Sequence, residues 1–385
     1  MTTGDEQYRP GGRITLPSGA RVGRLGIGCW PIGGPADNLG MPMGWSTATD
    51  RQARLGLERA FELGANLFDT ADVYGLGHSE RLLGGLLATV PRDQVAVASK
   101  VGYFTGTAGS AYAPGHMRRQ LEQTLENLGT PYLDVYALHN GNFGPEDRDL
   151  PAAVEALRSF QKEGLIRAVG MRGPHRYAPE RLQAAPGERE DKQQRFRRQF
   201  ELVRPEVLAV RDNLLTPHSS TGGIRAFAAE HGLTVLVNKP LGQGLLTGKH
   251  SPQAPPRFGA GDHRQRKAWF TAPALAVLDE HLGPVRERFG PERAELVRAA
   301  LHYLLHRWPG AAVLVGFTTV AQIEENLARP HRALSAEDLH SLAAAGAGAQ
   351  QALDALGEVF TDEDRGRSGH GAAETLPITR RVEDT

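Results

Sequence analysis

Eight short apolar runs that alternate with longer amphipathic segments constrain this chain most strongly. The runs occupy residues 24–30, 65–70, 95–100, 133–139, 166–172, 207–212, 233–239 and 311–317. Segments with helical spacing follow them, at residues 50–64, 79–89, 116–129, 151–163, 192–203, 222–231, 291–307 and 319–328. Strands that alternate with helices are typical of parallel βαβ units, and continuous apolar runs indicate strands covered on both faces. The sequence therefore predicts an α/β fold.

Eight strand–helix units favour a (β/α)8 TIM barrel over a doubly wound sheet. A doubly wound sheet usually begins with a glycine-rich turn, and no GxGxxG motif follows the first run. We expect an N-terminal β-hairpin around residues 17–19 and long loops at 31–49, 173–192 and 250–270. Ser79 is predicted to cap the helix that contains "ERLLGGLL".

The composition limits the class of protein. A length of 385 residues suits an α/β barrel, so we expect one domain over residues 1–360 and a polar, mobile tail over 361–385. The 44 basic and 44 acidic side chains cancel, without the basic surplus of a nucleic-acid binder. Cys29 is the single cysteine, and no apolar run resembles a leader or a membrane span. These features favour a cytoplasmic protein with no internal disulfide.

Polar and ionisable residues stand at the ends of six of the eight apolar runs. In barrels of this type, the loops after the carboxyl ends of the strands carry the chemistry. The residues concerned are Asp69, Lys100, His139, Asn140, Arg172, Asp212, Asn213, Asn238 and Lys239. One polar residue there would reflect only the solvated loop that follows, whereas polar residues at six ends indicate a site on one rim.

Asp69, Tyr74, Lys100 and His139 form a workable group for proton transfer. A free tyrosine has a pKa of about 10, and we expect the Lys100 ammonium to lower it. Asp69 would keep the lysine charged, and His139 would orient a substrate oxygen. The group suits protonation of a carbonyl oxygen as hydride reaches the carbon, or the reverse. No thiol or activated serine suggests acyl transfer.

Four stretches, "FDTADVYGLGHSERLLG", "VAVASKVG", "LDVYALH" and "PLGQGLLTGK", resemble aldo-keto reductases in sequence, order and spacing. The resemblance covers residues 13–330, approximately. It implies a (β/α)8 barrel that binds a nicotinamide cofactor, usually NADPH, without a Rossmann fold. The family's catalytic tetrad matches Asp69, Tyr74, Lys100 and His139, with Tyr74 in the position of the proton donor.

The expected cofactor pocket departs from the family's pattern at the nicotinamide end. Arg172-Gly173, Asp212-Asn213 and Asn238-Lys239 stand where relatives carry Ser-Asn, Tyr-Asn and Tyr-Ser. Thr318 replaces an arginine that contacts the adenosine 2′-phosphate, so NADH is possible beside NADPH. The cofactor-binding residues that the resemblance implies are Arg172, Asp212, Asn238, Lys239, Pro240, Leu241, Gln243, Gly244, Leu246, Gly316, Thr318, Gln322, Glu325 and Asn326.

Two interpretations of these departures stay open. The retained adenine and pyrophosphate segments favour a cofactor that still binds. Alternatively, Arg172 and Lys239 could bind an anionic substrate for a non-redox elimination or epimerisation, or Arg172 and Asp212 could form a structural ion pair. A non-catalytic regulatory or binding subunit is a further alternative, against which the complete tetrad argues.

The substrate pocket is expected above the tetrad. Its predicted walls are Trp30, Trp45, Tyr103, Phe104 and Asn140. The polar stretch 140–149 favours a small polar substrate such as a sugar derivative. His302 and His306 have metal-like spacing but no evident third ligand, so we predict no metal site. The sequence thus predicts an NAD(P)H-dependent reductase of an aldehyde or ketone.

Overall fold

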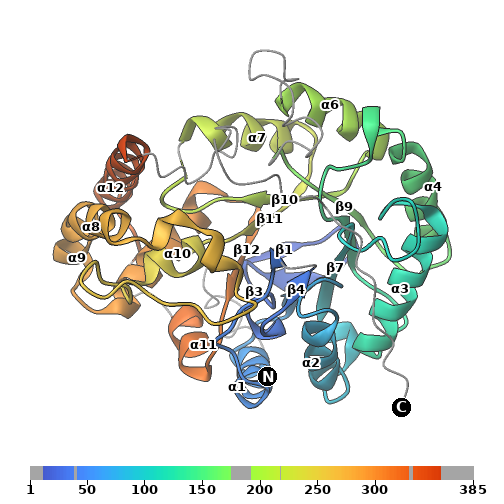
Figure 1. The fold of residues 1–385 in the computed structure, drawn as a ribbon, viewed down its shortest axis with the longest axis horizontal. Helices are drawn as coiled ribbons and strands as arrows, with labels where there is room; N and C mark the ends of the chain where they lie inside the picture. The colour runs from blue at the N-terminus through green and yellow to red at the C-terminus, as the bar shows by residue number, and fades with distance from the viewer. Residues whose placement is uncertain (1–11, 39–40, 175–191, 217, 329–332, 357–385) are drawn as a thin grey trace, which may run out of the picture.

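The computed structural model describes residues 12–38, 41–174, 192–216, 218–328 and 333–356. Within these residues, eight parallel strands close into a barrel (Figure 1). In chain order they are β3 (Leu25–Gly28), β6 (Leu67–Asp69), β7 (Ala96–Val101), β8 (Val135–Leu138), β9 (Val169–Arg172), β10 (Val207–Arg211), β11 (Thr234–Asn238) and β12 (Ala311–Gly316). Each lies within one of the eight apolar runs except β7, which extends one residue beyond the run 95–100. Neighbours in the chain are neighbours in the barrel, and β12 closes it against β3.

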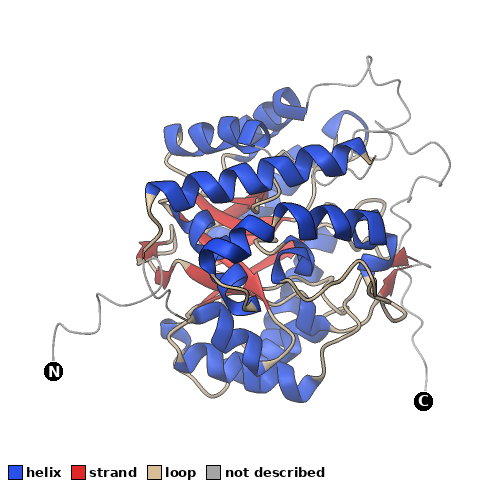
Figure 2. Cartoon of the chain, turned by 90° about the vertical axis from the view of Figure 1, so that its left-hand side faces the viewer, coloured by secondary structure: helices blue, strands red, loops and turns tan. Residues whose placement is uncertain are grey.

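Helices surround the barrel on its outer side (Figure 2). Eight of them match the predicted segments: α1 (Asp50–Glu62), α2 (His78–Leu87), α3 (Pro114–Leu128), α4 (Leu150–Lys162), α6 (Lys192–Val203), α7 (His218–Glu230), α10 (Arg293–Arg307) and α11 (Val320–Leu327). Their apolar faces and the outward faces of the strands share one large core. The structure therefore confirms the predicted (β/α)8 barrel.

Three further helices were not predicted: α8 (Ala272–His281), α9 (Gly283–Phe289) and α12 (Ala336–Ala355). They pack together beside α10 (Figure 1). α12 is rich in Ala and Gly and lacks a clear apolar stripe, so its sequence gives little helical signal. A capping box of Ser335 and Asp338 begins it, and the buried Asp338 also accepts a hydrogen bond from Arg288 at 2.5 Å. The tail at 361–385 lies outside the described residues.

The barrel interior is apolar at its amino-terminal end and polar at the opposite rim. Alternate strand residues such as Ala96, Ala98 and Val135 fill the interior. The predicted hairpin, β1 (Arg13–Thr15) with β2 (Arg21–Gly23), adds Leu16 and Val22 to the same cluster and closes that end. The polar strand ends therefore meet at the other rim, where a barrel of this type carries its site. No described helix is both long and apolar enough to cross a bilayer.

The prediction that Ser79 caps a helix is wrong. α2 begins at His78, and Gly77, with a left-handed φ of 86°, is its N-cap. The Ser79 hydroxyl instead donates to the carbonyl oxygen of Cys29 at 2.9 Å and lies 3.0 Å from the hydroxyl of Thr70. Ser79 therefore ties the start of α2 to the rim of the barrel.

Candidate active site

The structure brings the four predicted tetrad residues together at the polar rim. Asp69 ends β6, Lys100 lies in β7, and His139 directly follows β8. Because Ala96 and Ala98 fill the barrel interior, the alternation of the strand directs Lys100 into the same space. Tyr74 comes from the loop between β6 and α2.

A chain of hydrogen bonds centres on the Lys100 ammonium. Its Nζ donates to Asp69 Oδ1 at 2.7 Å, to the carbonyl oxygen of Thr70 at 2.6 Å and to Tyr74 Oη at 3.3 Å. Asp69 and Lys100 are each only 6% exposed. Burial alone would lower the pKa of Lys100, but Asp69 and Tyr74 outweigh it and raise the pKa. Lys100 is therefore a charged donor aimed at the phenol.

The electrostatics of Tyr74 differ from the expectation. Burial raises the pKa of Tyr74, and the nearby Lys100 offsets that rise only in part. The predicted net lowering is wrong, because the phenol lies in a drier environment than its sequence context shows. Tyr74 therefore keeps its proton at neutral pH, which suits a group that donates one.

His139 is held neutral beside the phenol. Its ring centroid lies 5.7 Å from that of Tyr74, edge to face. Burial lowers the pKa of His139 well below its usual value, and Lys100, Arg172 and Lys239 lower it further. A neutral imidazole can donate one N–H to a substrate oxygen without adding a second charge to the site.

Glycine is required next to Tyr74 because two backbones touch there. A Cβ on Gly75 would lie 1.9 Å from the carbonyl oxygen of Gly33, and Gly75 also has a left-handed φ of 60°. Gly33 belongs to η2 (Pro31–Gly33), directly after Trp30. The Tyr74 loop is therefore packed directly against the first rim loop.

Aromatic rings form a wall beside the tetrad, as predicted for three residues. Trp30 stacks on Tyr74 with centroids 5.8 Å apart and planes 21° apart, and Trp45 meets the edge of Trp30 at 5.8 Å. Tyr103 packs edge to face on His139 at 4.7 Å. The three rings therefore lie beside Tyr74 and His139 of the tetrad.

The other two predicted wall residues hold loops in place. The backbone carbonyl oxygen of Phe104 lies 2.6 Å from Nε2 of His116. Asn140 donates from its side-chain amide to the carbonyl oxygen of Gly102 at 2.6 Å and accepts from Tyr112 at its own carbonyl, at 2.8 Å. The amide nitrogen of Asn140 thus has a protein partner.

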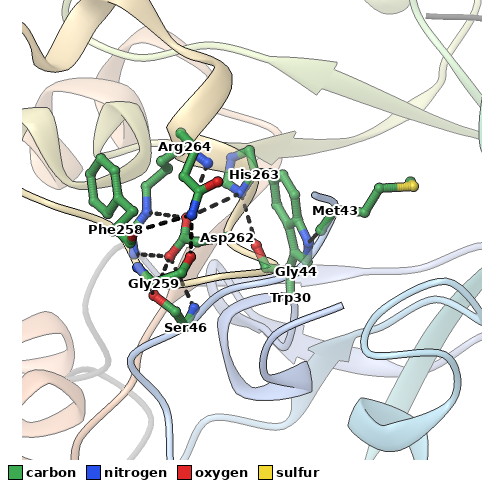
Figure 3. Close-up of polar contacts among 10 residues, drawn as sticks. Trp30, Met43, Gly44, Ser46, Phe258, Gly259, Asp262, His263 and Arg264 are labelled. Atoms are coloured by element: carbon green, nitrogen blue, oxygen red, sulfur yellow. Dashed lines mark hydrogen bonds and ion pairs between the residues drawn. The ribbon is translucent and has the colours of Figure 1, made fainter. Parts of the chain in front are cut away.

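A clamp between two distant loops was missed by sequence reasoning (Figure 3). Asp262 accepts from the backbone and the hydroxyl of Ser46, both at 2.9 Å, and from Arg264 at 2.6 Å and 2.9 Å. The Arg264 guanidinium is only 1% exposed and lies between Trp45 at 3.8 Å and Phe258 at 4.2 Å. The predicted loop 250–270 therefore contains two short 3-10 helices, η7 (His263–Arg266) and η8 (Ala268–Phe270).

The clamp supports the aromatic wall through His263. The His263 ring lies 4.2 Å from Trp30, and its Nδ1 lies 3.1 Å from the carbonyl oxygen of Gly44. Burial lowers the pKa of His263 well below its usual value. A neutral His263 therefore donates from Nδ1 to the carbonyl oxygen of Gly44. Through the contact of His263 with Trp30, residues 262–264 help to position Trp30 and the Tyr74 ring that stacks on it. In the sequence, only the charged stretch Asp262-His263-Arg264 in an otherwise polar loop could have indicated this clamp.

Asp212 is turned away from the rim. Its buried carboxylate pairs with Arg307 at 3.2 Å and accepts from the indole of Trp308 at 2.6 Å. Burial raises the pKa of Asp212 to about 6, although Arg307 opposes the shift. The ion pair considered between Arg172 and Asp212 is wrong, and this geometry speaks against the predicted cofactor contact of Asp212. β10 ends at Arg211. Leu208 and Val210 face the outer core, and Asp212, two residues further along, faces the same way.

The predicted pyrophosphate loop presents buried polar groups without protein partners. Gln243 is 7% exposed, and both polar atoms of its side chain lack a hydrogen-bond partner among the residues that the structure describes. The same is true of Oδ1 of Asn238, at the end of β11. Gln243 and Lys239 also hold left-handed φ angles of 61° and 59°. Unpaired buried polar atoms and strained backbone of this kind fit a ligand that supplies the missing partners.

Other predicted cofactor residues surround this loop. Pro240 precedes it, Leu241 opens η6 (Gly242–Thr247), and Gly244 and Leu246 lie within it. Lys249, which was not predicted, has its Cε 3.5 Å from where a Cβ on Gly244 would lie. Burial lowers the pKa of Lys249, and Arg264 and Arg293 add to the shift. The side chain of Lys249 therefore lies beside Gly244 of this loop.

The predicted adenine-side residues are held by the start of α11. Gln322 accepts from the backbone and hydroxyl of Thr318 at 2.7 Å and 3.1 Å, and Asn326 donates to the carbonyl oxygen of Gly316 at 3.2 Å. Glu325 pairs with Arg293 at 2.7 Å. Thr318 supplies no charge for a 2′-phosphate, and Arg293, the cation that contacts these residues, is paired with Glu325.

The chain is similar to known proteins over most of its length. A relative from Escherichia coli (strain K12), "NADH-specific methylglyoxal reductase", is 30% identical over 334 residues, which span 82% of this chain and 92% of the relative. "L-galactose dehydrogenase" from Arabidopsis thaliana is 27% identical over 81% of this chain and 85% of its own. A solved glycerol dehydrogenase from Gluconobacter oxydans superimposes with a TM-score of 0.65 at 24% identity, over 89% of this chain and 95% of the other.

The chain also matches the model of a protein family. The model described as "Aldo/keto reductase family" matches residues 24–347, which include the whole barrel and the four tetrad positions. The match extends beyond α11 into α12, past residue 330, where the resemblance of the sequence motifs ends. The chain is therefore an oxidoreductase of the aldo/keto reductase family.

Proposed function

We propose that this chain reduces an aldehyde or ketone on a small polar molecule, with NADPH or NADH as the hydride source. The observation that carries the proposal is the hydrogen-bond chain from Asp69 through Lys100 to Tyr74, with Nζ 2.7 Å from the carboxylate and 3.3 Å from the phenol. Membership of the family and relatives named as methylglyoxal and glyceraldehyde 3-phosphate reductases support the proposal.

In this proposal, Tyr74 donates its phenolic proton to the carbonyl oxygen. The charged Lys100 stabilises the phenolate that results, and Asp69 keeps the lysine in place. Neutral His139 donates an N–H to the same oxygen and orients the substrate. Trp30 and Tyr103 exclude water from one side of the reacting carbon. A bound nicotinamide would supply the hydride for that carbon.

The residues toward the cofactor fit a nicotinamide dinucleotide at one end better than at the other. The unpaired side chain of Gln243 and the nearby Lys249 suit the pyrophosphate, and Gln322 and Asn326 suit the adenine side. At the nicotinamide end, Arg172 and Asn238 stand where relatives carry the amide-binding and stacking residues, so we do not expect the contacts that relatives make there. We therefore propose that both NADPH and NADH can bind, with the dinucleotide held mainly by its phosphate end.

Titration of the purified protein with NADPH and with NADH tests this proposal. Trp30 lies beside the tetrad, so quenching of tryptophan fluorescence should report binding, and calorimetry should confirm a micromolar Kd for at least one form. A Gln243→Leu variant, which keeps the side-chain size but not the polar atoms, should bind more weakly. If neither form binds a folded protein at millimolar concentration, the hydride-transfer proposal is wrong and the non-redox alternative gains support.

A further inference from the structure

We infer that Arg172 binds an anionic group, a carboxylate or a phosphate, on the substrate whose carbonyl the tetrad reduces. The inference rests on the proposed function and names its substrate class. It also gives Arg172 a different role from the predicted one, since the resemblance placed this residue among the cofactor contacts.

The first support is the register of the strands. Leu138 of β8 pairs with Met171 of β9, so the next pair along the rim is His139 and Arg172. Met171 faces the outer core, whereas a Cβ on Gly170 would meet Ala137 inside the barrel. The alternation of β9 therefore directs Arg172 inward, beside the imidazole that would orient the substrate oxygen.

The second support is the bonding of the Arg172 side chain. Its Nε is buried and has no hydrogen-bond partner among the described residues. The carboxylates at the neighbouring strand ends are committed elsewhere, because Asp69 pairs with Lys100 at 2.7 Å and Asp212 pairs with Arg307 at 3.2 Å. A buried guanidinium N–H without an acceptor is costly, and a planar oxyanion would supply one.

The third support is the balance of charge around the tetrad. Arg172, Lys100 and Lys239 all act on His139, and Lys239 Nζ lies 5.4 Å from the centroid of Trp30. Burial raises the pKa of the nearby Asp72 carboxyl well above its usual value, so it adds little negative charge. Lys100 is paired with Asp69, so Arg172 and Lys239 add positive charge beside the reacting centre, which attracts anions.

The geometry also indicates where the anion would lie. Arg172 is adjacent to His139, whereas Tyr74 lies across the pocket from β9, next to Trp30. A substrate oxygen shared by Tyr74 and His139 therefore leaves the neighbouring carbon substituent facing β9. We expect short substrates that carry the anion a few atoms from the carbonyl to be preferred over neutral ones of the same length.

Matched pairs of substrates provide the test. Glyceraldehyde is compared with glyceraldehyde 3-phosphate, and butanal with succinic semialdehyde, so the two pairs distinguish phosphate from carboxylate. For the wild type, at least one anionic member should have a kcat/KM roughly tenfold or more above its neutral partner. Arg172→Gln should remove most of that preference, since charge-assisted hydrogen bonds are worth roughly tenfold to hundredfold.

Arg167→Gln is the matched control. Arg167 precedes β9 at the opposite end of the barrel, and its guanidinium carbon lies 3.7 Å from the centroid of the Tyr132 ring. The variant therefore removes one positive charge, as Arg172→Gln does, but far from the rim. This variant should keep the substrate preference. If Arg172→Gln does not fold, Arg172→Lys, which keeps the charge but loses the planar fork, should show a reduced preference.

Two further measurements separate failure of this inference from failure of the proposed function. If Arg172→Gln weakens the Kd for NADPH or NADH and slows all four substrates equally, Arg172 is a cofactor residue and the inference is overturned. If the wild type turns over none of the substrates, calorimetry with inorganic phosphate and with succinate decides. Binding of either anion that is lost in Arg172→Gln supports the site, and absence of binding to the wild type overturns it.

Discussion

The two ends of the proposed pocket differ in how their polar groups are satisfied. At the tetrad, Lys100 donates three hydrogen bonds to protein oxygens, and the phenol already has its partner. At the predicted cofactor end, buried side-chain atoms of Gln243 and Asn238 have no partner among the described residues, and the same holds for Nδ1 of His139 beside the phenol. The comparison indicates that the chain from Asp69 through Lys100 to Tyr74 is preorganised by the protein alone, and we expect bound ligands to supply the partners that the other groups lack.

The largest effect should come from removing the phenolic hydroxyl of the preorganised end. Tyr74→Phe deletes the proposed proton donor but keeps the ring that stacks on Trp30, so kcat should fall by about 10²- to 10⁴-fold. Binding of NADPH and NADH should be unchanged, which calorimetry can check. Retention of most activity would show that another group protonates the substrate, and the contrast between the two ends would lose its basis.

Breaking the Asp262 clamp should cost stability rather than chemistry. Asp262→Asn leaves the buried Arg264 guanidinium without its carboxylate, and loss of one partner of a buried pair costs roughly 3–5 kcal/mol. Urea unfolding of the wild type and the variant measures the difference. Asp279→Asn, which removes an exposed partner of Arg286, is the control and should change stability by less than about 1 kcal/mol. A similar loss in both variants would contradict the role of the clamp.

The cofactor end can be weakened without touching the tetrad. Lys249→Met removes an exposed cation beside the predicted pyrophosphate loop, so the Kd for the preferred cofactor should rise by about tenfold, or ~1.4 kcal/mol. At saturating cofactor, kcat should stay close to that of the wild type. A fall in kcat with unchanged Kd would mean that the two ends are coupled in a way the hydrogen bonds do not show.

The smallest effect concerns pH. His139 and His263 are buried and neutral, with folded-state pKa values well below the unfolded value near 6.5. The unfolded chain therefore binds protons that the folded chain does not, and stability is lost as the pH falls below about 6.5. For each histidine, the free energy of unfolding should fall by up to about 1.4 kcal/mol for each pH unit in that range. His139→Gln should show a shallower slope between pH 7 and 5, and an unchanged slope would contradict a neutral buried His139.

Much of the fold could be predicted because its signals are local. Each barrel strand coincides with an apolar run to within a few residues, and the tetrad follows from residues at strand ends that share one rim. The orientation of Asp212 does not follow from its place at a strand end, since it depends on which residues of β10 face outward: Leu208 and Val210 do, and Asp212 continues their alternation. The clamp was also hidden, because Ser46 and Asp262 are 216 residues apart in the chain.

The net effect on Tyr74 illustrates a second limit of sequence reasoning. The sequence places a lysine near the phenol and so predicts a lower pKa. The packing of Trp30 and His139 around the ring buries the phenol, and that burial outweighs the charge. The sign of a pKa shift depends on the three-dimensional surroundings, which a motif does not specify.

The most direct test of the central claim is transfer of a label from cofactor to product. The purified protein would be incubated with NADPH or NADH deuterated at C4 on either face, and with glyceraldehyde or succinic semialdehyde, and the alcohol would be analysed by mass spectrometry. The account predicts one deuterium on the carbinol carbon from one cofactor face, and loss of that product in Tyr74→Phe. Cofactor that binds but is never oxidised, with no label in any product, would contradict it.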